Sequence, residues 1–472
     1  MTFGLKGQWF IGFLMLLSFL AIITISQFKI SLELEDAEQS YYTQSWRLGY
    51  DDQPPLYTWM QKATNNIFGL SKFSLSFLRG VLYAATLVGL FFLGKKILNN
   101  DHKAQLVVLS TALVPVFADF AFRRLSHTLL LCFVIVLSCL ALACLKKRKS
   151  LGNYIFLGVC LGIGMLSKYN YVLFVAAISI AALSSKDLRE IVLDIKIFIP
   201  IIIGLLLFLP HLYWIFSDDH LQKIQESVSM KMNGKTSGLI ILSPMWNTFM
   251  AFFQTASLLV LATLLLWWLK RIKCKVNGGS KWFFRLFVVQ IMVLLVFFVV
   301  TDVENVEARW LLPLFLPYLV LWIGCLSEDN GRLRQWGGFV FVLFIVFQVV
   351  RTPAEVLMDI KSDNQFDYAP LSNMLRNKHP NEVWVLPDVT YGGQIRLLNE
   401  GKTIYTLDDF SIPANAKVSR KGVVLAKAKD DFDELQPIDS LLQYGPEKDD
   451  IFLFEVDDVA QMYFRGPLIL KQ

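Results

Sequence analysis

Eleven apolar segments, each near the length that crosses a bilayer, constrain this chain more than any other feature. A transmembrane helix needs about 20 predominantly apolar residues. Only 18% of the residues are charged and 55% are hydrophobic, whereas about a quarter of the residues in a soluble domain are usually charged. The sequence therefore predicts a polytopic α-helical membrane protein with about 11 transmembrane helices. The segments lie at 9–28, 75–94, 104–122, 126–145, 151–167, 170–184, 195–216, 247–269, 282–300, 310–326 and 336–351.

Basic residues between these segments predict the orientation. Lys and Arg cluster in alternate connections, and such clusters mark the cytoplasmic side. The N-terminus is then cytoplasmic, and the run after Lys6, which is too long for a signal peptide and lacks a cleavage site, is a retained first span. Residues 1–351 are predicted to form the transmembrane domain, with outer loops at 29–74 and 217–246, and residues 352–472 a small α/β extracytoplasmic domain.

Charge and cysteine spacing give no indication of nucleic-acid binding, of a disulfide framework or of a zinc site. The net charge of +6 lies mostly in short clusters between spans, so nucleic-acid binding is not implied. The six cysteines fall in or beside apolar runs without paired spacing, so neither a disulfide framework nor a zinc site is predicted.

Four cations break the expected charge bias because they lie at outer ends of spans. A phosphate group held at that depth would explain them, since Arg binds phosphate through two donors and Lys as a point charge. The alternative is pairing with the nearby Asp119, Asp302, Glu304 or Glu307, or with lipid headgroups. The four are Arg123, Arg124, Lys168 and Arg309.

The first outer loop combines acidic and aromatic residues. Carboxylates follow the first span at Glu33, Glu35, Asp36 and Glu38, and one of them could act as general base on an acceptor hydroxyl; a solvated acidic face is the alternative. The aromatic rings that follow suit the apolar faces of a sugar, although an interfacial aromatic belt explains them equally well. The residues predicted to contact substrate are Tyr41, Tyr42, Tyr50, Gln53, Pro54, Pro55, Tyr57 and Trp59.

Three motifs resemble the GT-C glycosyltransferases related to protein O-mannosyltransferases and to the lipid A aminoarabinose transferase. The first is Asp36-Ala37-Glu38 followed by Tyr41-Tyr42, Gly49-Tyr50, Pro54-Pro55-Leu56 and Trp59. The second is Gly158-x-x-x-Gly162-x-Gly164-x-x-x-Lys168-Tyr169, and the third is Arg309-Trp310-Leu311-Leu312-Pro313. The resemblance covers roughly the first 320 residues.

The resemblance implies a GT-C fold and inverting transfer of one sugar from a polyprenyl-phosphate carrier. The acceptor would be lipid A or another envelope glycolipid, at the periplasmic face of the bacterial inner membrane, with the C-terminal domain periplasmic. Asp36 would be the general base and Glu38 would orient the acceptor or serve as the base, because Ala37 separates two carboxylates that many relatives carry side by side. Lys168, Arg123 or Arg124, and Arg309 would bind the carrier phosphate, and Tyr169 would contact substrate.

Several alternatives stay open. His127 could bind acceptor, take a proton or coordinate a metal, but a lone histidine is more often a packing residue. No cofactor or metal site is predicted with certainty, and a divalent cation beside the phosphate is an open alternative. The loop at 217–246 is either a mobile lid or an ordinary solvated loop. A transporter or flippase for an anionic lipid-linked substrate is the rival function, although the sequence lacks the internal repeat expected of one.

Overall fold

The computed structural model describes residues 7–232, 242–272, 280–301, 303, 306–327, 331–358, 360, 365–412, 421–427, 437–446, 448–457 and 459. The chain divides into two compact units. The first unit comprises Met1–Thr24, Asp52–Tyr57 and Arg79–Val350, and the second comprises Ile25–Asp51, Thr58–Leu78 and Arg351–Gln472. The second unit therefore combines the C-terminal segment with most of the first outer loop.

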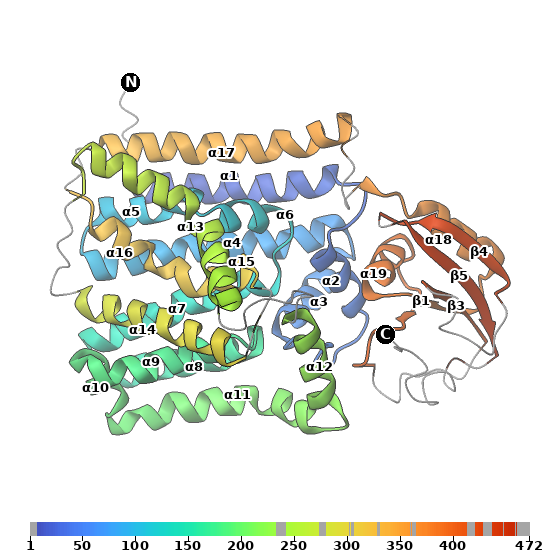
Figure 1. The fold of residues 1–472 in the computed structure, drawn as a ribbon, viewed down its shortest axis with the longest axis horizontal. Helices are drawn as coiled ribbons and strands as arrows, with labels where there is room; N and C mark the ends of the chain where they lie inside the picture. The colour runs from blue at the N-terminus through green and yellow to red at the C-terminus, as the bar shows by residue number, and fades with distance from the viewer. Residues whose placement is uncertain are drawn as a thin grey trace. The chain divides into compact units, whose positions relative to one another are not determined.

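The first unit is helical, and its long helices run side by side in Figure 1. Its helices, some of which continue into the second unit, are α1 (Gly7–Phe28), α4 (Lys72–Leu98), α5 (Asp101–Leu109), α6 (Ala121–Arg123), α7 (His127–Lys147), α8 (Leu151–Ser167), α9 (Tyr171–Ser184), α10 (Lys186–Val192), α11 (Phe198–Phe216), α12 (His220–Met232), α13 (Leu242–Trp268), α14 (Lys281–Val300), α15 (Ala308–Phe315), α16 (Leu319–Gly324) and α17 (Arg332–Leu357).

All eleven predicted segments form apolar helices, but not all are straight spans. Among the described residues, seven helices are long and apolar enough to cross a membrane, or up to nine if each of two bent pairs counts as one span. One pair bends by 82° between residues 101–113 and 116–123, where Pro115 interrupts the helix, and α9 and α10 are bent by 116°. The segments 151–167 and 308–324 are shorter apolar helices.

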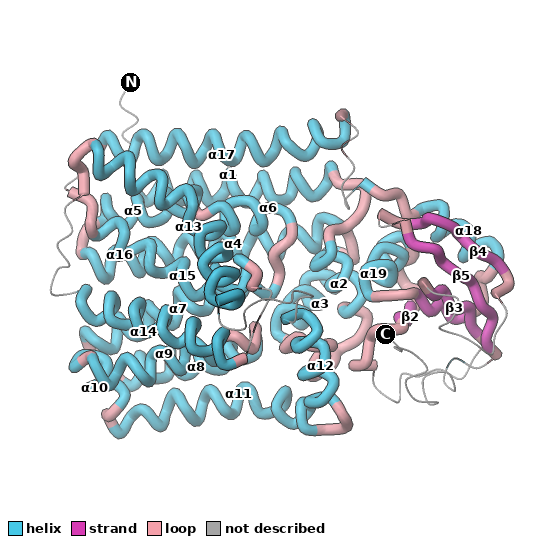
Figure 2. The backbone as a smooth tube through the Cα atoms, in the orientation of Figure 1, coloured by secondary structure: helices cyan, strands magenta, loops and turns pink. Residues whose placement is uncertain are grey.

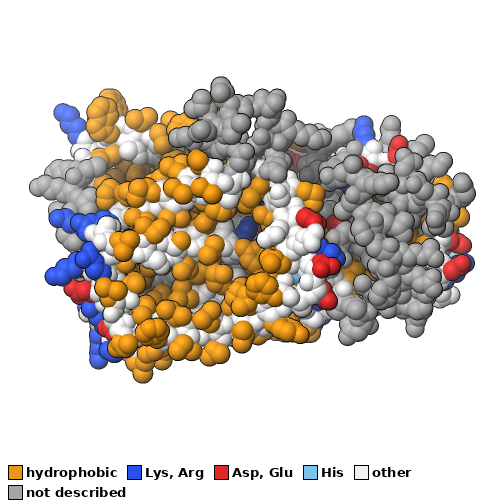
Figure 3. All heavy atoms as spheres, turned by 60° about the horizontal axis from the view of Figure 1, so that its bottom comes forward, with side chains coloured by type: hydrophobic (Ala, Val, Ile, Leu, Met, Phe, Trp, Pro, Cys, Tyr) orange, Lys and Arg blue, Asp and Glu red, His pale blue; other side chains and the backbone are white. Residues whose placement is uncertain are grey.

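The surface of the first unit fits a lipid environment. Figure 3 shows a face on which hydrophobic side chains form a broad band, with Lys and Arg gathered at one end. Leu205 and Leu206 of α11 are 57% and 63% exposed, as expected when the bilayer is the solvent. Lys146 at the end of α7 pairs with Asp187 of α10 at 3.1 Å. The chain is thus a multi-pass membrane protein.

Small residues allow α8 and α11 to pack closely. A Cβ atom added to Gly158 would lie 2.7 Å from the Cα atom of Pro200, and one added to Gly162 would lie 2.6 Å from the side chain of Leu207. Such contacts require glycine at the helix interface. This close packing holds α8, with Lys168 directly after its C-terminal end, against α11.

The described strands belong to the second unit, where they form one sheet in the order β2-β1-β3-β5-β4 (Figure 2). Strands β2, β1 and β3 are parallel, with Trp384 opposite Ile404, and β5 runs antiparallel to both β3 and β4. The strands are β1 (Val383–Leu386), β2 (Ile404–Thr406), β3 (Gly422–Ala426), β4 (Asp439–Tyr444) and β5 (Asp449–Val456).

Two helices cover one face of this sheet. Helices α18 (Ala369–Lys378) and α19 (Val389–Leu398) contribute Leu375 and Ile395 to a core with residues of β1 and β3. The opposite face carries a second core that includes Val424. The same unit contains α2 (Leu34–Tyr42) and most of α3 (Leu56–Phe68).

Candidate functional site

The acidic segment of the first outer loop is helix α2, and this shape separates the two predicted catalytic carboxylates. Residues two apart on a helix differ by about 200° in direction, so Asp36 and Glu38 point to nearly opposite sides. Asp36 is 4% exposed, whereas Glu38 is partly exposed. The two carboxylates therefore have different surroundings. In this arrangement they do not lie on both sides of one acceptor hydroxyl.

Helix α2 packs directly against α19 of the same unit. Ala37 is fully buried, and a Cβ atom added to Gly393 would lie 2.5 Å from the carbonyl carbon of Ala37. The Ser40 hydroxyl donates to the Gly393 carbonyl at 2.8 Å. The amide side chain of Gln394 accepts from the Leu32 N–H at 2.9 Å and donates to the Leu32 carbonyl at 2.7 Å. Ala37, which separates the carboxylates in sequence, is thus the contact point of the two helices.

A buried ion pair forms a second anchor between the loop and the C-terminal segment. Arg47 donates to Asp409 at 2.7 Å, and their side chains are 7% and 0% exposed. The Tyr41 hydroxyl donates to the same Asp409 oxygen at 3.0 Å. Burial alone would lower the pKa of Arg47, but the charge of Asp409 outweighs burial and raises it above its ordinary value. Asp409 is therefore a structural acceptor for two residues of the first outer loop.

Three aromatic residues predicted to contact sugar lie in the interior of the second unit. Tyr41, Tyr42 and Tyr50 are at most 4% exposed and pack together with part of Trp59. The Tyr42 hydroxyl donates to Asp51 at 2.8 Å, and burial raises the pKa of Tyr50 to about 12. Their rings form a core in this structure.

The segment with the Pro-Pro pair belongs to the first unit. Asp52 is 7% exposed and accepts hydrogen bonds from Ser227 of α12 at 2.9 Å and from Lys231. Burial alone would raise the pKa of Asp52, but Lys231 and Ser227 more than offset burial and hold it below its usual value. Residues 220–232, predicted as part of an outer loop, are a helix that reaches Asp52. Asn233, Gly234, Lys235, Ser237 and Gly238 lie outside the described residues.

Nearby, the ring of Tyr57 lies 5.2 Å from the ring of His127, between centroids. Pro54 and Pro55 are both buried just before α3, and Gln53 donates to Asp52 at 3.1 Å. Proline restricts the backbone at both positions, so the pair fixes how the chain enters the helix. Residues 52–57 are therefore held by contacts with α7 and α12.

Hydrogen bonds join three segments that carry or follow closely after predicted phosphate-binding residues. Lys168 donates to the Thr128 hydroxyl at 2.9 Å, and the His127 ring lies 3.4 Å from the carbonyl of Ser167. Asn170 donates to the carbonyl of Trp310 at 3.3 Å, next to Arg309. The start of α7, the turn after α8 and the start of α15 therefore meet within the first unit.

The arginines at these segments have partners inside the protein. Arg309 pairs with Glu307, one of the partners predicted for it, and Arg124 lies 3.8 Å above the ring of Phe120. The carbonyl of Arg123 accepts from the buried Arg79 at 2.6 Å. Asp302 and Glu304 lie outside the described residues.

The sequence did not lead us to predict that Tyr169 has a buried histidine as its partner. His211 of α11 is fully buried, and its ring nitrogen lies 3.1 Å from the hydroxyl of Tyr169. The ring of His211 also stacks on that of Trp214. A polar side chain inside an apolar segment is a recognised signal of function or of an internal partner, and His211 directly after Pro210 carried that signal. Asp409 carried no local signal of its role, because its partners in the first outer loop lie more than 360 residues away.

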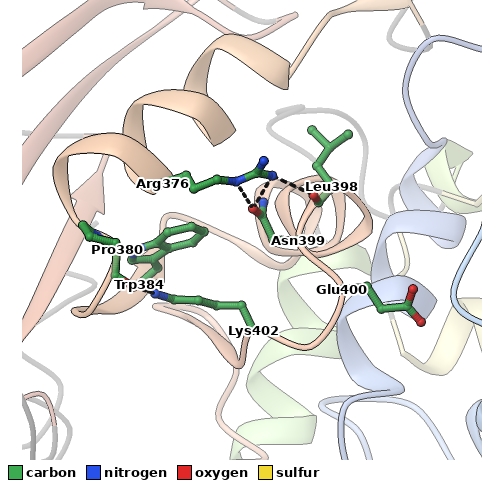
Figure 4. Close-up of a pocket in the computed structure, with 7 residues that line it drawn as sticks. All are labelled: Arg376, Pro380, Trp384, Leu398, Asn399, Glu400 and Lys402. Carbon is green, nitrogen blue, oxygen red and sulfur yellow. Dashed lines mark hydrogen bonds between the residues drawn. The ribbon is translucent and has the colours of Figure 1, made fainter.

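The second unit also contains a pocket of about 330 Å³ near the ends of α18 and α19 (Figure 4). Arg376 donates to the Asn399 side chain at 2.9 Å and to the Leu398 carbonyl at 3.1 Å. Lys402 donates to the Pro380 carbonyl at 2.8 Å and lies 4.1 Å above the ring of Trp384. Both cations satisfy carbonyl groups near helix ends, which is a stabilising role in the fold.

The part of the chain that the structure describes contains no group of three or more His, Cys, Asp or Glu side chains placed to share a metal ion. The predicted carboxylates belong to the second unit and the predicted cations to the first. A common site for the carboxylates and the cations, which the family resemblance implies, stays a prediction.

Comparisons with known proteins agree with the family resemblance. Residues 52–214 match the family model described as dolichyl-phosphate-mannose-protein mannosyltransferase. The chain is 26% identical over 322 residues to the lipopolysaccharide core galacturonosyltransferase RgtB of Rhizobium johnstonii, covering 67% of this chain and 65% of RgtB. It is 26% identical over 406 residues to RgtA of the same organism, a lipopolysaccharide core galacturonosyltransferase, covering 84% of this chain and 81% of RgtA.

The fold also matches a solved structure. ArnT from Cupriavidus metallidurans, bound to undecaprenyl phosphate, superposes with a TM-score of 0.62 at 10% sequence identity and covers 94% of this chain and 97% of ArnT. The predicted resemblance to GT-C glycosyltransferases and the predicted GT-C membrane fold are confirmed.

Proposed function

We propose that this chain is an inverting glycosyltransferase that moves one sugar from a polyprenyl-phosphate carrier to an envelope glycolipid. The observation that carries the proposal is the meeting of the turn at Lys168 with the start of α15 at Arg309, beside an apolar cavity. A phosphate needs cationic donors and its prenyl chain needs an apolar channel, so the two features together suit a lipid-linked donor.

The apolar cavity lies within the first unit. It has a volume of about 200 Å³. Arg309 is near the beginning of α15, and Leu312 and Phe315 of the same helix line the cavity one and two turns later. A carrier phosphate held at Arg309 would thus direct its first isoprene groups toward this cavity. Other lining residues include Val114, Phe252, Ala256, Phe287 and Trp322.

The chemical step requires one base and a stabilised leaving group. In the proposed reaction Asp36 accepts the proton of the acceptor hydroxyl while the hydroxyl oxygen attacks the anomeric carbon of the donor sugar. The bond from that carbon to the phosphate oxygen breaks, and the negative charge stays on the polyprenyl phosphate. Lys168 and the arginine side chains stabilise this charge. The configuration inverts because the attack occurs in a single displacement.

The relatives' names suggest which substrates to test first. RgtB and RgtA are named for galacturonosyl transfer to the lipopolysaccharide core. A third relative from Rhizobium johnstonii, RgtD, is 27% identical over 193 residues, covering 40% of this chain and 39% of RgtD, and is named a lipid A galacturonosyltransferase. We propose galacturonic acid as the first donor sugar to test, with lipid A and the lipopolysaccharide core as acceptors. The reaction would take place at the periplasmic face of the inner membrane, with the C-terminal domain in the periplasm.

The test compares envelope lipids from cells with wild-type protein, with Asp36→Asn and without the protein. Mass spectrometry should detect a lipid heavier by one sugar residue only with the wild type. Native mass spectrometry of purified Asp36→Asn should still detect bound polyprenyl phosphate, because the substitution removes the base and leaves the cations. Glu35→Gln is a matched control, since Glu35 lies on the same helix and is similarly buried.

The outcomes separate the alternatives. Full activity of Asp36→Asn would contradict its role as base, and loss of activity in Glu38→Gln alone would assign that role to Glu38. Transfer of an intact lipid-linked sugar across the membrane without a new glycosidic bond would instead support the flippase alternative.

A further inference from the structure

Asp409 is the main buried contact between the first outer loop and the segment after β2. One of its carboxylate oxygens accepts from Arg47 and from the Tyr41 hydroxyl. The other accepts from the N–H of Ser411 at 2.9 Å and from its hydroxyl at 2.6 Å. All four donors are directional, so the carboxylate fixes the two loop residues relative to the sheet.

These contacts restrain α2, which carries the carboxylates. Tyr41 is four residues after Ala37, so both lie on the face of α2 that packs on α19. A hydrogen bond at the Tyr41 hydroxyl therefore limits rotation of the helix about its own axis. Rotation is the motion that would most change the direction of Asp36 and Glu38, because they lie on either side of that face.

A third contact fixes the end of α2 along the sheet. Gln44 donates to the carbonyl of Ile404 at 3.1 Å and accepts from its N–H at 2.8 Å. Ile404 begins β2, which is the edge strand of the sheet, so the amide side chain of Gln44 satisfies backbone groups that an edge strand leaves open. The loop is attached both by α19 and by the edge of the sheet.

We propose that Asp409 is a positioning residue for sugar transfer, and that it acts through Tyr41 and Arg47 to hold α2, and with it Asp36, in one orientation. This inference rests on the proposed function. Through these two contacts the C-terminal segment affects turnover, and this effect is separate from recognition of the acceptor.

The test measures both the helix and the reaction in full-length protein. Asp409→Asn weakens the ion pair but retains a side chain of the same size. Amide hydrogen exchange of α2 should become at least about tenfold faster, while exchange in β1 and β3 stays unchanged. In the transfer assay kcat should fall by about 10- to 100-fold, with the KM for the lipid-linked donor within about twofold of wild type.

Two further variants distinguish positioning from general destabilisation. Val424→Ala removes buried volume on the sheet face opposite α19, so it weakens the same unit without touching α2; its kcat should equal that of wild type. Tyr41→Phe deletes one hydroxyl and should reproduce part of the effect of Asp409→Asn. The double variant Asp409→Asn/Tyr41→Phe should lose less kcat than the two single losses combined, because both substitutions affect the same hydrogen bond.

Each outcome decides the proposal. Unchanged exchange of α2 in both Asp409→Asn and Tyr41→Phe would overturn it, as would an equal loss of kcat in Val424→Ala. If Asp409→Asn does not fold, Tyr41→Phe alone provides both readouts. If the wild type transfers no sugar, the proposed function fails, and the exchange rates still decide whether Asp409 restrains α2.

Discussion

Gly393→Ala offers a direct test of the contact between α19 and the carboxylate helix. The added Cβ atom would lie 2.5 Å from the carbonyl carbon of Ala37 and 2.7 Å from its Cα atom. Carbon atoms that are not bonded prefer about 3.5–4.0 Å. Because the obstructing atoms are backbone, no side chain can turn aside, and the two helices must separate by about 1 Å.

The magnitude follows from two opposing effects. Overpacking of a tight interface costs about 1–3 kcal/mol, while alanine in place of glycine inside a helix gains about 0.5–1 kcal/mol. We expect a net loss of about 1–2 kcal/mol in the free energy of unfolding of the second unit. A displacement of about 1 Å at a reacting group can reduce the rate by about 100-fold, so kcat should fall far more than the modest loss of stability implies.

The assay combines thermal unfolding in detergent with the transfer reaction at saturating donor. Gly152→Ala is the matched control, because Gly152 is also helical and has no atom within 4 Å of the added Cβ. The control should unfold at the same or a slightly higher temperature and keep its kcat. Wild-type kcat in a folded Gly393→Ala protein would refute the reasoning that α19 sets the position of α2.

Two other predictions concern the first unit. Lys231→Ala removes the ammonium group and should lower the unfolding free energy at pH 7 by up to about 1 kcal/mol, since the Lys231 side chain is 56% exposed. The pKa of Asp52 in the folded protein is below its usual value. The stabilisation is therefore fully present above the unfolded pKa of about 4, and it disappears as the pH falls through the folded pKa. If the unfolding midpoints of wild type and Lys231→Ala differ by the same amount at pH 7 and at pH 3, the prediction is wrong. Ala256→Phe fills part of the apolar cavity and should raise the KM of a long-chain donor by about tenfold, but not that of a short-chain analogue. Equal KM changes for both donors would exclude a prenyl chain there.

Local patterns were enough to predict much of the fold. Apolar segments predicted where the apolar helices of the described residues lie, because a span in lipid requires about 20 apolar residues in a row and this requirement is visible without any partner. The bend at Pro115 and the α12 helix in the second outer loop were not predicted. A proline allows a break without specifying its angle, and the polar segment at 220–232 becomes ordered where Ser227 and Lys231 reach Asp52.

The sequence by itself determined that the chain lies in a membrane, that it resembles GT-C glycosyltransferases, and which residues are candidates for the chemistry. Tertiary structure decided which candidates are core and how the carboxylate helix is held. Tyr41, Tyr42 and Tyr50 were predicted to contact sugar, but they are buried with each other. The ion pair of Arg47 with Asp409 and the contact of Ala37 with Gly393 join residues more than 350 positions apart, and such pairs depend on folding of the whole unit rather than on any local pattern.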